Sequence, residues 1–236
     1  MRAEFDFDGS VVLVTGVGGA LGSAVATGFN AAGATVCGLD IVDPDDESFI
    51  LDDPSLIDFY GADATNEDEV AATVANIVDD HGRLDAVANI AGTWRGGDPL
   101  DETGVDTFDF LFDVNLKTMF LVSKHTLPHL REAEGSIVSV SARSSLEGGE
   151  GDGIYRASKA GVRLLTETIA EENRGTVRAN AVMPSVIDTP MNRDMMPDAD
   201  FDEWVDPTEI ARTVCALCSD ATPVTSGAAV PVYGEA

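Results

Sequence analysis

Short apolar runs alternate with longer segments of helical periodicity along this chain. Runs rich in Val, Ile and Ala predict strands at 10–16, 34–40, 57–63, 84–92, 135–141, 176–184 and, before a short tail, within 224–236. The helical pattern of apolar residues predicts helices at 20–33, 66–82, 108–130 and 154–173. Strands that are apolar along their whole length are typical of a parallel sheet covered by helices. The sequence therefore predicts an α/β fold in which parallel strands alternate with helices.

This alternation is that of a doubly wound parallel sheet, the Rossmann fold, with helices on both faces and ligands outside the carboxyl ends of the strands. At 236 residues and 44% hydrophobic, the chain can bury one core, so residues 1–236 are predicted to form a single domain. The sequence shows no leader-like N-terminal pattern, and no apolar stretch approaches the roughly 20 residues that span a bilayer. We therefore expect a soluble, cytoplasmic protein that binds no membrane.

The net charge is strongly negative. The sequence holds 42 acidic and 14 basic residues, a formal net charge of -28, and its only lysines are Lys117, Lys124 and Lys159. Such a surface repels nucleic acid and anionic membranes. The acidic residues are spread along the chain rather than gathered in one tail, which predicts an evenly acidic folded surface. We interpret this composition as that of a halophile, whose multimolar salt screens self-repulsion to within a few ångströms.

Cysteine and histidine give no indication of a metal site or of redox chemistry. Cys215 and Cys218 have a C-x-x-C spacing inside a predicted helix, without a second ligand pair. His125 and His129 stand four residues apart, but no carboxylate accompanies them at the position that a helical zinc motif requires. We predict packing roles for the cysteines, surface or core positions for the histidines, and no metal.

A glycine-rich turn, VTGVGGALG, joins the first predicted strand to the first predicted helix. Glycine allows a tight turn and a close backbone approach, and the N–H groups at a helix start can hold a pyrophosphate. The turn alone is a weak signal, and its place between strand and helix strengthens it. The residues predicted to contact a dinucleotide here are Gly16, Gly19, Ala20, Leu21 and Gly22.

Asp40 ends the second predicted strand, roughly 20 residues after the turn, where a carboxylate can accept hydrogen bonds from an adenosine ribose. The same charge would repel a 2′-phosphate. No arginine or lysine lies near the glycine turn or directly after Asp40. We therefore predict NAD (NADH) rather than NADP(H) as the cofactor. The alternative is a solvated loop acid in an acid-rich protein.

Tyr155 and Lys159 stand four residues apart in a chain that is poor in lysine. On a helix this spacing puts both side chains on one face, so the ammonium can lie near the phenol oxygen and favour the phenolate. A free tyrosine has a pKa near 10 and is a poor base at neutral pH. We expect Lys159 to lower the pKa of Tyr155, which would make Tyr155 a general acid and base. The alternative is an ordinary pair of exposed helix residues.

Taken together, these motifs resemble the short-chain dehydrogenase/reductase family over essentially the whole chain. The residues that match its glycine turn and its Tyr-x-x-x-Lys motif are Thr15, Gly16, Ala20, Gly22, Tyr155 and Lys159. Ala20 departs from the glycine that is usual at its position. The resemblance also implies contacts with the cofactor, which fall on Asp63, Ala64, Asn89, Ala91, Gly92, Tyr155, Lys159, Pro184, Ile187 and Thr189.

The resemblance implies an NAD-dependent oxidoreductase that moves a hydride between nicotinamide and a small alcohol or carbonyl compound. Tyr155 would carry the substrate proton, and Asn115 matches the asparagine that holds a water in the proton relay from Lys159. The C-terminal half, with DTPMNRDMMPDADFDEW and Trp94, resembles the dihydropteridine-reductase branch. A dihydropteridine-type reductase and a non-catalytic NAD-binding sensor are therefore the two alternative hypotheses.

A serine is expected to hydrogen-bond the substrate oxygen and to stabilise charge that develops there. Ser141 ends a predicted strand and precedes Tyr155 by one residue more than the family's usual spacing, which falls on Ala142. One additional loop residue before Tyr155 would restore Ser141 to this place. We predict Ser141 as the catalytic serine and keep Ser139 and Ser144 as alternatives.

Residues 191–206 are rich in Met, Asp and Pro and too irregular for a core helix. We predict that they form a lid over the substrate, with methionines and Trp204 as adaptable apolar contacts. The resemblance further implies a homo-oligomer, a dimer or homotetramer, that pairs through the helices at 108–130 and 155–172. Both helices carry apolar residues on more than one face, which one sheet could not cover.

Overall fold

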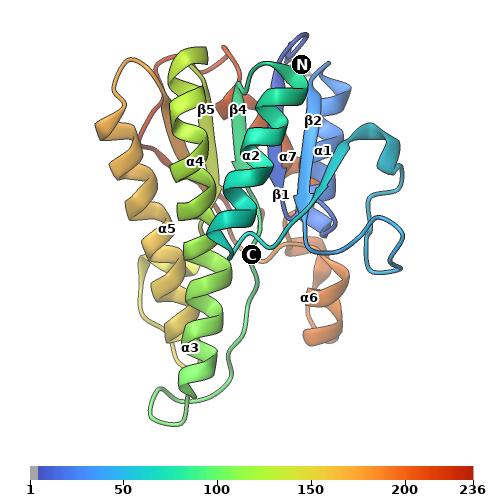
Figure 1. The fold of residues 1–236 in the computed structure, drawn as a ribbon. Helices are drawn as coiled ribbons and strands as arrows, with labels where there is room; N and C mark the ends of the chain where they lie inside the picture. The colour runs from blue at the N-terminus through green and yellow to red at the C-terminus, as the bar shows by residue number, and fades with distance from the viewer. Residues whose placement is uncertain (1–4, 236) are drawn as a thin grey trace.

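Within residues 5–235, which the computed structural model describes, seven parallel strands form one sheet in the order β3-β2-β1-β4-β5-β6-β7 (Figure 1). The strands are β1 (Val11–Thr15), β2 (Thr35–Asp40), β3 (Asp58–Gly61), β4 (Ala86–Asn89), β5 (Ser136–Val140), β6 (Arg178–Pro184) and β7 (Ala229–Val232). The strand order reverses between β1 and β4, which makes their carboxyl ends the point where such sheets bind ligands. The doubly wound parallel sheet is confirmed; residues 1–4 and 236 of the predicted domain lie outside the described residues.

Helices cover both faces of the sheet. Their bounds are α1 (Ala20–Ala31), α2 (Glu67–His81), α3 (Val105–Phe112), α4 (Thr118–Ala133), α5 (Gly153–Glu172), α6 (Pro190–Met195) and α7 (Pro207–Cys218). In Figure 1, α2, α4 and α5 lie in front of the sheet and α1 and α7 behind it. Each face buries its own apolar core, which contains Phe29 and Val214 on the α1–α7 side and Ile77 and Leu130 on the other side.

The sequence pattern follows directly from this double cover. Every residue of β1, β4 and β5 is buried, because these central strands have helices on both faces. The edge strand β3 is only partly buried. Local signals fix the helix ends: the Asn66 side chain accepts a hydrogen bond from the Asp68 N–H at the start of α2, and Gly82 ends that helix with φ of 76°.

The long helix predicted at 108–130 is interrupted in the middle. It begins as α3, passes through a π-helical turn at Asp113–Lys117 and continues as α4. A π-helical turn inside an α-helix often marks a functional position, because it redirects the side chains of that turn. Asn115 lies in this turn and is 1% exposed. The interruption therefore places a buried polar residue beside the carboxyl edge of the sheet.

The connection from β2 to β3 holds only a short 3₁₀ turn at Pro54–Leu56. Its remainder folds back over the glycine turn. Phe49 is buried, and the N–H of Ile50 donates to the carbonyl of Gly18 at 2.9 Å. An aromatic side chain thus packs where the chain leaves β1 for α1.

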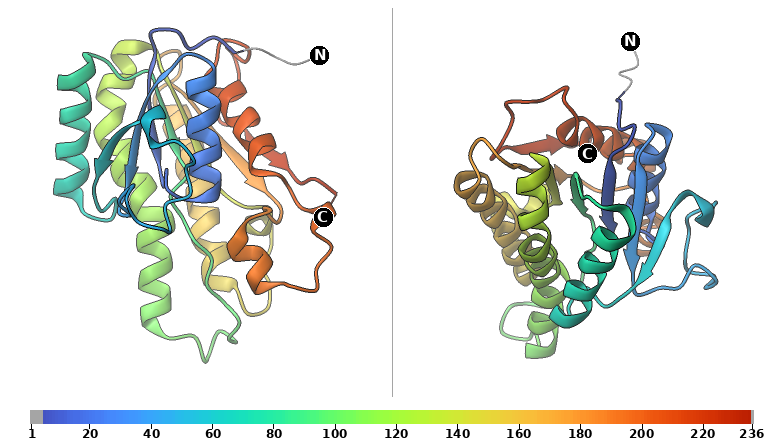
Figure 2. Two further views of the ribbon diagram at one scale, coloured as in Figure 1. Left: turned by 90° about the vertical axis from the view of Figure 1, so that its right-hand side faces the viewer. Right: turned by 45° about the horizontal axis from the view of Figure 1, so that its top comes forward.

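The segment predicted as a lid contains more regular structure than expected. It forms α6 and a 3₁₀ turn at Phe201–Glu203, with the rings of Phe201 and Trp204 packed at 4.8 Å between centres. A β-bridge between Ile187 and Val205 closes its base. Figure 2 shows α6 standing beyond the carboxyl edge of the sheet.

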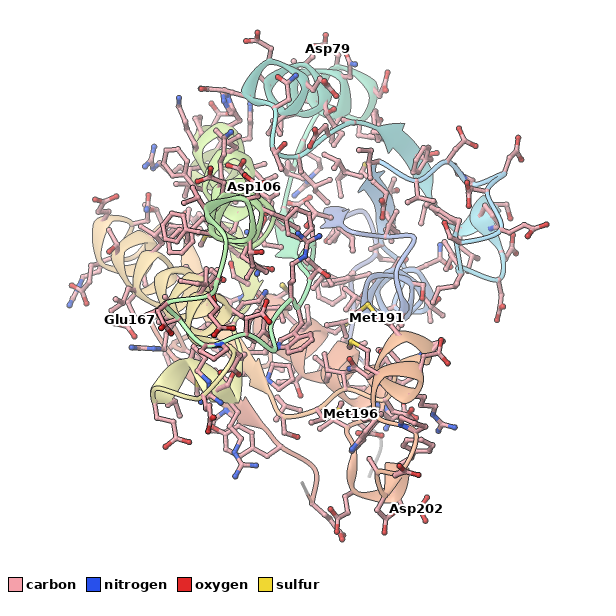
Figure 3. The ribbon with its side chains drawn as sticks, turned by 90° about the horizontal axis from the view of Figure 1, so that it is seen from below. Asp79, Asp106, Glu167, Met191, Met196 and Asp202 are labelled. Carbon is pink, nitrogen blue, oxygen red and sulfur yellow. The ribbon has the colours of Figure 1, made fainter. Side chains whose placement is uncertain are left out.

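Acidic side chains surround the molecule rather than gathering on one side. Asp79 of α2, Asp106 of α3, Glu167 of α5 and Asp202 all point outward, on different sides of the fold (Figure 3). This arrangement agrees with the evenly acidic surface expected from the sequence. In the part of the chain that the structure describes, no helix is both long and apolar enough to cross a membrane.

Candidate active site

The carboxyl ends of the strands, with the loops that follow them, form the candidate site. Figure 3 looks onto this edge of the sheet. Met191, in the first turn of α6, lies near the start of α1 in this view, and Met196 directly follows α6. The predicted site residues come from strands β1 to β6 or the segments that follow them, from the π-helical turn at Asp113–Lys117 and from the first turns of α5.

At two positions, the glycine turn after β1 lies so close to other backbone atoms that no side chain fits. Gly16 has φ of 68°, and a Cβ there would lie 2.9 Å from Cα of Ala91. A Cβ on Gly22 would overlap the carbonyl oxygen of Gly16. The hydroxyl of Thr15 accepts hydrogen bonds from the N–H groups of Ile90 and Ala91, at 3.0 and 3.1 Å. The turn and the loop after β4 therefore form one close-packed unit.

The first turn of α1 faces the same edge and offers backbone donors. Gly19, its N-cap, has an extended backbone and no side-chain cap, and no acidic residue lies in the first turn. The first N–H groups of a helix have no partner inside it, and the helix dipole favours an anion there. Ala20 and Leu21 supply such groups and have small or apolar side chains. These features fit the pyrophosphate of a dinucleotide.

Asp40, at the end of β2, is held beside the glycine turn. Its Oδ2 accepts a hydrogen bond from the Gly18 N–H at 2.8 Å, and its Oδ1 accepts one from the Val42 N–H at 3.0 Å. Each oxygen keeps a second lone pair, so the carboxylate can still accept hydrogen bonds from ribose hydroxyls. A Cβ on Gly18 would lie 2.6 Å from the Phe49 ring, so this ring fixes the turn from the other side. The carboxylate is therefore oriented before any ligand binds.

Asp63 and Ala64 follow β3, at the predicted adenine end of the site. The Oδ1 atom of Asp63 accepts hydrogen bonds from the N–H and the hydroxyl of Thr65, at 2.8 and 2.7 Å. Ala64 is buried. This turn shapes the end of β3, and contact of either residue with an adenine stays a prediction.

Asn89 holds the end of β4 to its neighbours. Its Nδ2 donates to the hydroxyls of Ser123 and Ser139, both at 3.3 Å, and its Oδ1 has no hydrogen-bond partner. Both serines are buried, which places Ser139 inside the sheet rather than at the open edge. A direct contact of Asn89 with the cofactor stays a prediction.

Tyr155 and Lys159 lie on the first two turns of α5. Lys159 is 4% exposed, and its Nζ donates to the carbonyl of Val140 at 3.0 Å. A Cβ on Gly92 would lie 2.8 Å from the Lys159 Nζ and 2.9 Å from the Asn115 Oδ1. The structure therefore brings the lysine, the asparagine and the loop after β4 together at one point.

Burial dominates the pKa values of Tyr155 and Lys159. Burial, and to a smaller extent the charge of Asp152, raises the pKa of Tyr155 to about 12. Burial lowers the pKa of Lys159 to about 8. Tyr155 is itself only partly buried, and the Lys159 Nζ donates to the Val140 carbonyl, so the expectation that Lys159 lowers the pKa of Tyr155 gains no support here and stays a prediction. Tyr155 is protonated at neutral pH.

Asn115 is fixed by backbone groups and by a buried serine. Its Oδ1 accepts from the Thr93 N–H at 2.8 Å, and its Nδ2 donates to the Thr93 carbonyl at 3.0 Å and to the Ser158 Oγ at 3.2 Å. Ser158 in turn donates to the carbonyl of Tyr155 at 2.7 Å. Sequence reasoning missed Ser158, although its place directly before Lys159 on the buried side of the helix was an available signal. The proposed water relay at Asn115 stays a prediction.

The Ser141 hydroxyl faces α5. Its Oγ donates to the carbonyl of Lys159 at 2.8 Å and lies 3.1 Å from the Ser145 Oγ, and the residue is 2% exposed. A hydroxyl has one proton, so in this geometry Ser141 cannot also donate to a substrate oxygen. Ala142, at the family's usual serine position, is buried as well, whereas Ser144 is partly exposed on a 3₁₀ turn. The catalytic role predicted for Ser141 therefore gains no support from its hydrogen bonds.

The segment after β6 joins the predicted nicotinamide site to α6. Pro184 is the last residue of β6, and Ile187 forms the β-bridge with Val205. The Oγ1 of Thr189 caps α6 by accepting a hydrogen bond from the Asn192 N–H at 3.1 Å. The residues predicted to contact nicotinamide therefore also anchor the segment predicted as a lid.

A cavity of about 350 Å³ lies between the loop after β4 and the start of α5. Thr103, Thr107 and Asp98 line one side of it, and residues 149–154 line the other. Arg95 also lines it and places its guanidinium carbon 3.9 Å from the centre of the Phe110 ring. A cavity of this size can hold a small molecule. It adjoins the turn from which Tyr155 projects.

The cysteines lie in the core. Cys37, Cys215 and Cys218 are buried free thiols, and burial raises their pKa to about 12, about 12 and about 11. Thiols held protonated in this way are poor nucleophiles and poor metal ligands. Over residues 5–235, no group of three or more His, Cys, Asp and Glu side chains is placed to hold a metal ion.

A family model described as enoyl-(acyl carrier protein) reductase matches residues 16–234. The match spans the glycine turn from Gly16 onward, strands β2 to β7 and the helix that carries Tyr155 and Lys159. The chain belongs to the short-chain dehydrogenase/reductase family. Its class is therefore that of an oxidoreductase that uses a nicotinamide cofactor.

Several relatives match almost end to end. The 3-oxoacyl-(acyl-carrier-protein) reductase FabG of Thermotoga maritima is 32% identical over 240 residues, which cover 96% of this chain and 97% of that protein. Meso-2,3-butanediol dehydrogenase of Serratia marcescens is 31% identical over 240 residues, covering 98% and 95%. The ligand-free structure of aldohexose dehydrogenase from Thermoplasma acidophilum has a TM-score of 0.87 at 27% identity, covering 98% and 95%. These names refer to different oxo and hydroxy compounds, so the similarity defines a class of reaction rather than one substrate.

Proposed function

We propose that the protein is an NAD(H)-dependent oxidoreductase that transfers a hydride between nicotinamide and a small alcohol or carbonyl compound. The observation that carries the proposal is the meeting of Lys159 Nζ, Asn115 Oδ1 and the loop at Gly92, beside Tyr155 on α5. Nicotinamide supplies the hydride chemistry when it is bound. The protein holds the cofactor, orients the substrate and moves a proton at the phenol oxygen of Tyr155.

Asp40 supports NAD(H) over NADP(H). Its carboxylate is held by two backbone N–H groups at the end of β2, with lone pairs left for ribose hydroxyls. The stretch that follows it, IVDPDDESFILDD, adds negative charge and no basic residue. A 2′-phosphate at this place would meet like charge without a cationic partner. We therefore expect the acidic surroundings of Asp40 to favour binding of NADH over NADPH.

Tyr155 carries the substrate proton in this proposal. Its pKa is raised to about 12, so the phenol is protonated at neutral pH and holds the proton that a carbonyl oxygen would take up as it gains charge. Lys159, whose pKa is lowered to about 8, is a neighbouring group that can exchange a proton close to neutral pH. Asn115 is held by the backbone of Thr93 and donates to the hydroxyl of Ser158, which precedes Lys159 and donates to the Tyr155 carbonyl.

Residues 191–206 act as the substrate lid in this proposal. Met191 and Met196 are 50% and 39% exposed, in and directly after α6, which stands beyond the carboxyl edge of the sheet (Figure 2). Methionine adapts its shape to apolar ligands. The names of the relatives above favour an oxo or hydroxy substrate over a pterin, and a sensor would have no need of Asn115, Tyr155 and Lys159 together.

We further propose that the protein is a homo-oligomer and that it works in the cytoplasm of a halophile. Phe108 of α3, Phe120 of α4 and Leu164 of α5 are 42%, 48% and 52% exposed. Large apolar side chains exposed on neighbouring helices fit a surface that a second copy of the chain covers. The excess of 42 acidic over 14 basic residues fits a solvent in which salt screens their repulsion.

The test is nucleotide absorbance at high salt. The purified protein is mixed with NADH or NADPH and a panel of ketones, ketoacyl thioesters, oxidised sugars and quinonoid dihydropterin. We expect a carbonyl compound to be reduced with NADH in preference to NADPH. Turnover of the pterin alone would support the dihydropteridine-type alternative, and NADH binding without turnover across the panel would support the sensor.

A further inference from the structure

Two consecutive residues at the end of β5 hold Lys159 at opposite ends. The Val140 carbonyl accepts a hydrogen bond from Nζ at 3.0 Å, and the Ser141 hydroxyl donates to the backbone carbonyl of Lys159 at 2.8 Å. All three residues are buried, with exposed fractions of 8%, 2% and 4%. The lysine is therefore fixed at both its tip and its base by one strand.

The bond from Ser141 is additional to those of the helix. A carbonyl inside an α-helix accepts the N–H of the residue four positions later and keeps one lone pair. Ser141 uses that lone pair at Lys159, from outside the helix. The backbone of α5 does not need this bond to complete its own hydrogen bonds. The bond instead sets the distance and rotation of α5 relative to β5. The position of the Lys159 ammonium beside Asn115 depends on this distance and on this rotation.

We infer that Ser141 is a positioning residue for Lys159 and not the group that hydrogen-bonds the substrate oxygen. Its only proton is given to the α5 backbone, its side chain is closed off from solvent, and Ser145 Oγ at 3.1 Å occupies another side of the hydroxyl. The importance of Lys159 for the reaction rests on the proposed function. The geometric part of the inference, in which Ser141 holds Lys159, does not rest on the proposed function.

The scarcity of lysine allows a direct test. In protein labelled with ¹³C,¹⁵N-lysine, Lys117, Lys124 and Lys159 each give one set of side-chain NMR signals, and the first two, 48% exposed, serve as internal references. In Ser141→Ala we expect the Lys159 signals to move and its titration midpoint to fall, because a loosened bond to the Val140 carbonyl no longer favours the ammonium. The reference signals should stay in place.

Two further variants separate the hydroxyl from its surroundings. Ser139→Ala removes a buried hydroxyl from the same strand that contacts Asn89 and not α5, so it should leave the Lys159 signals unchanged. Ser141→Thr keeps a hydroxyl and should restore them. Unchanged Lys159 signals in Ser141→Ala would overturn the inference.

Steady-state kinetics distinguish the two roles in turnover. Loss of one buried hydrogen bond that acts through Lys159 should lower kcat by about two- to tenfold, with KM for the carbonyl compound retained. A serine that contacts the reacting oxygen would instead cost roughly a hundredfold or more in kcat; that result with unmoved Lys159 signals contradicts our assignment. If the wild-type protein reduces no carbonyl compound, the proposed function fails, and the NMR comparison still decides the role of Ser141.

Discussion

Replacing Lys159 with methionine should change how stability depends on pH. Lys159 is buried, and the pKa of its ammonium is lowered from 10.5 to about 8. Between these values the unfolded chain binds a proton that the folded chain has lost, so the free energy of unfolding rises with pH. Below pH 8 both states are protonated and the whole cost of burying the charge is present. Methionine has a similar length and no charge, so the variant lacks this dependence.

The expected size follows from the shift. A shift from 10.5 to about 8, at about 1.4 kcal/mol per pKa unit, corresponds to roughly 3 kcal/mol of destabilisation at low pH. We integrate the difference in bound protons between the unfolded and folded chain from pH 7 to about pH 9.5. About 2 kcal/mol of this destabilisation disappears over that interval. The difference in the free energy of unfolding, wild type minus Lys159→Met, should therefore increase by about 2 kcal/mol across this interval.

The assay is urea unfolding of both proteins at constant high salt at the two pH values. Other buried groups contribute with the opposite sign: Cys37, Cys215 and Cys218 have raised pKa values, so unfolded thiols lose protons first and stability falls above about pH 9. Both proteins share these thiols, so subtraction removes their effect. If the difference in the free energy of unfolding between the two proteins changes by less than about 0.5 kcal/mol between the two pH values, the claim that Lys159 is a buried ammonium with a lowered pKa is refuted.

Three further outcomes follow from the same geometry. Gly92→Ala puts a methyl group between Lys159 Nζ and Asn115 Oδ1 and should cut kcat by at least about tenfold with little change in circular dichroism; full activity would show that this space is not needed. Asp40→Asn should narrow the preference for NADH over NADPH by about tenfold in kcat/KM, and an unchanged ratio would remove Asp40 from cofactor selection. Lowering salt from about 3 M to about 0.1 M should lower the melting temperature, because 42 acidic residues face 14 basic ones; a melting temperature independent of salt would contradict the halophilic interpretation.

The sheet could be predicted because burial on both faces leaves a simple pattern in the sequence. Strands β1, β4 and β5 are buried throughout and appear as uninterrupted apolar runs. The glycine positions were equally informative, since Gly16 and Gly22 lie where any side chain would meet backbone atoms. Burial of a strand residue and lack of space at a glycine each act on a single position, so the residue type at that position is enough to indicate them.

Side-chain direction at the ends of elements could not be predicted in the same way. Whether Ser141 faces the open edge or α5 depends on the register of β5 against the helix, and spacing along the chain does not determine that. The π-helical turn around Asn115 was hidden inside a continuous helical pattern. The pKa of Tyr155 depends on its burial in the fold, which its spacing to Lys159 along the chain does not reveal.

The central claim is that Tyr155 transfers the substrate proton while the rest of the site holds the cofactor. The most direct test compares wild type with Tyr155→Phe, measuring NADH affinity by fluorescence titration and carbonyl reduction by absorbance in the same high-salt buffer. Our account predicts a loss of about 10²–10⁴ in kcat, with NADH affinity kept within about twofold. A variant that keeps more than about a tenth of the wild-type turnover would show that another group carries the proton.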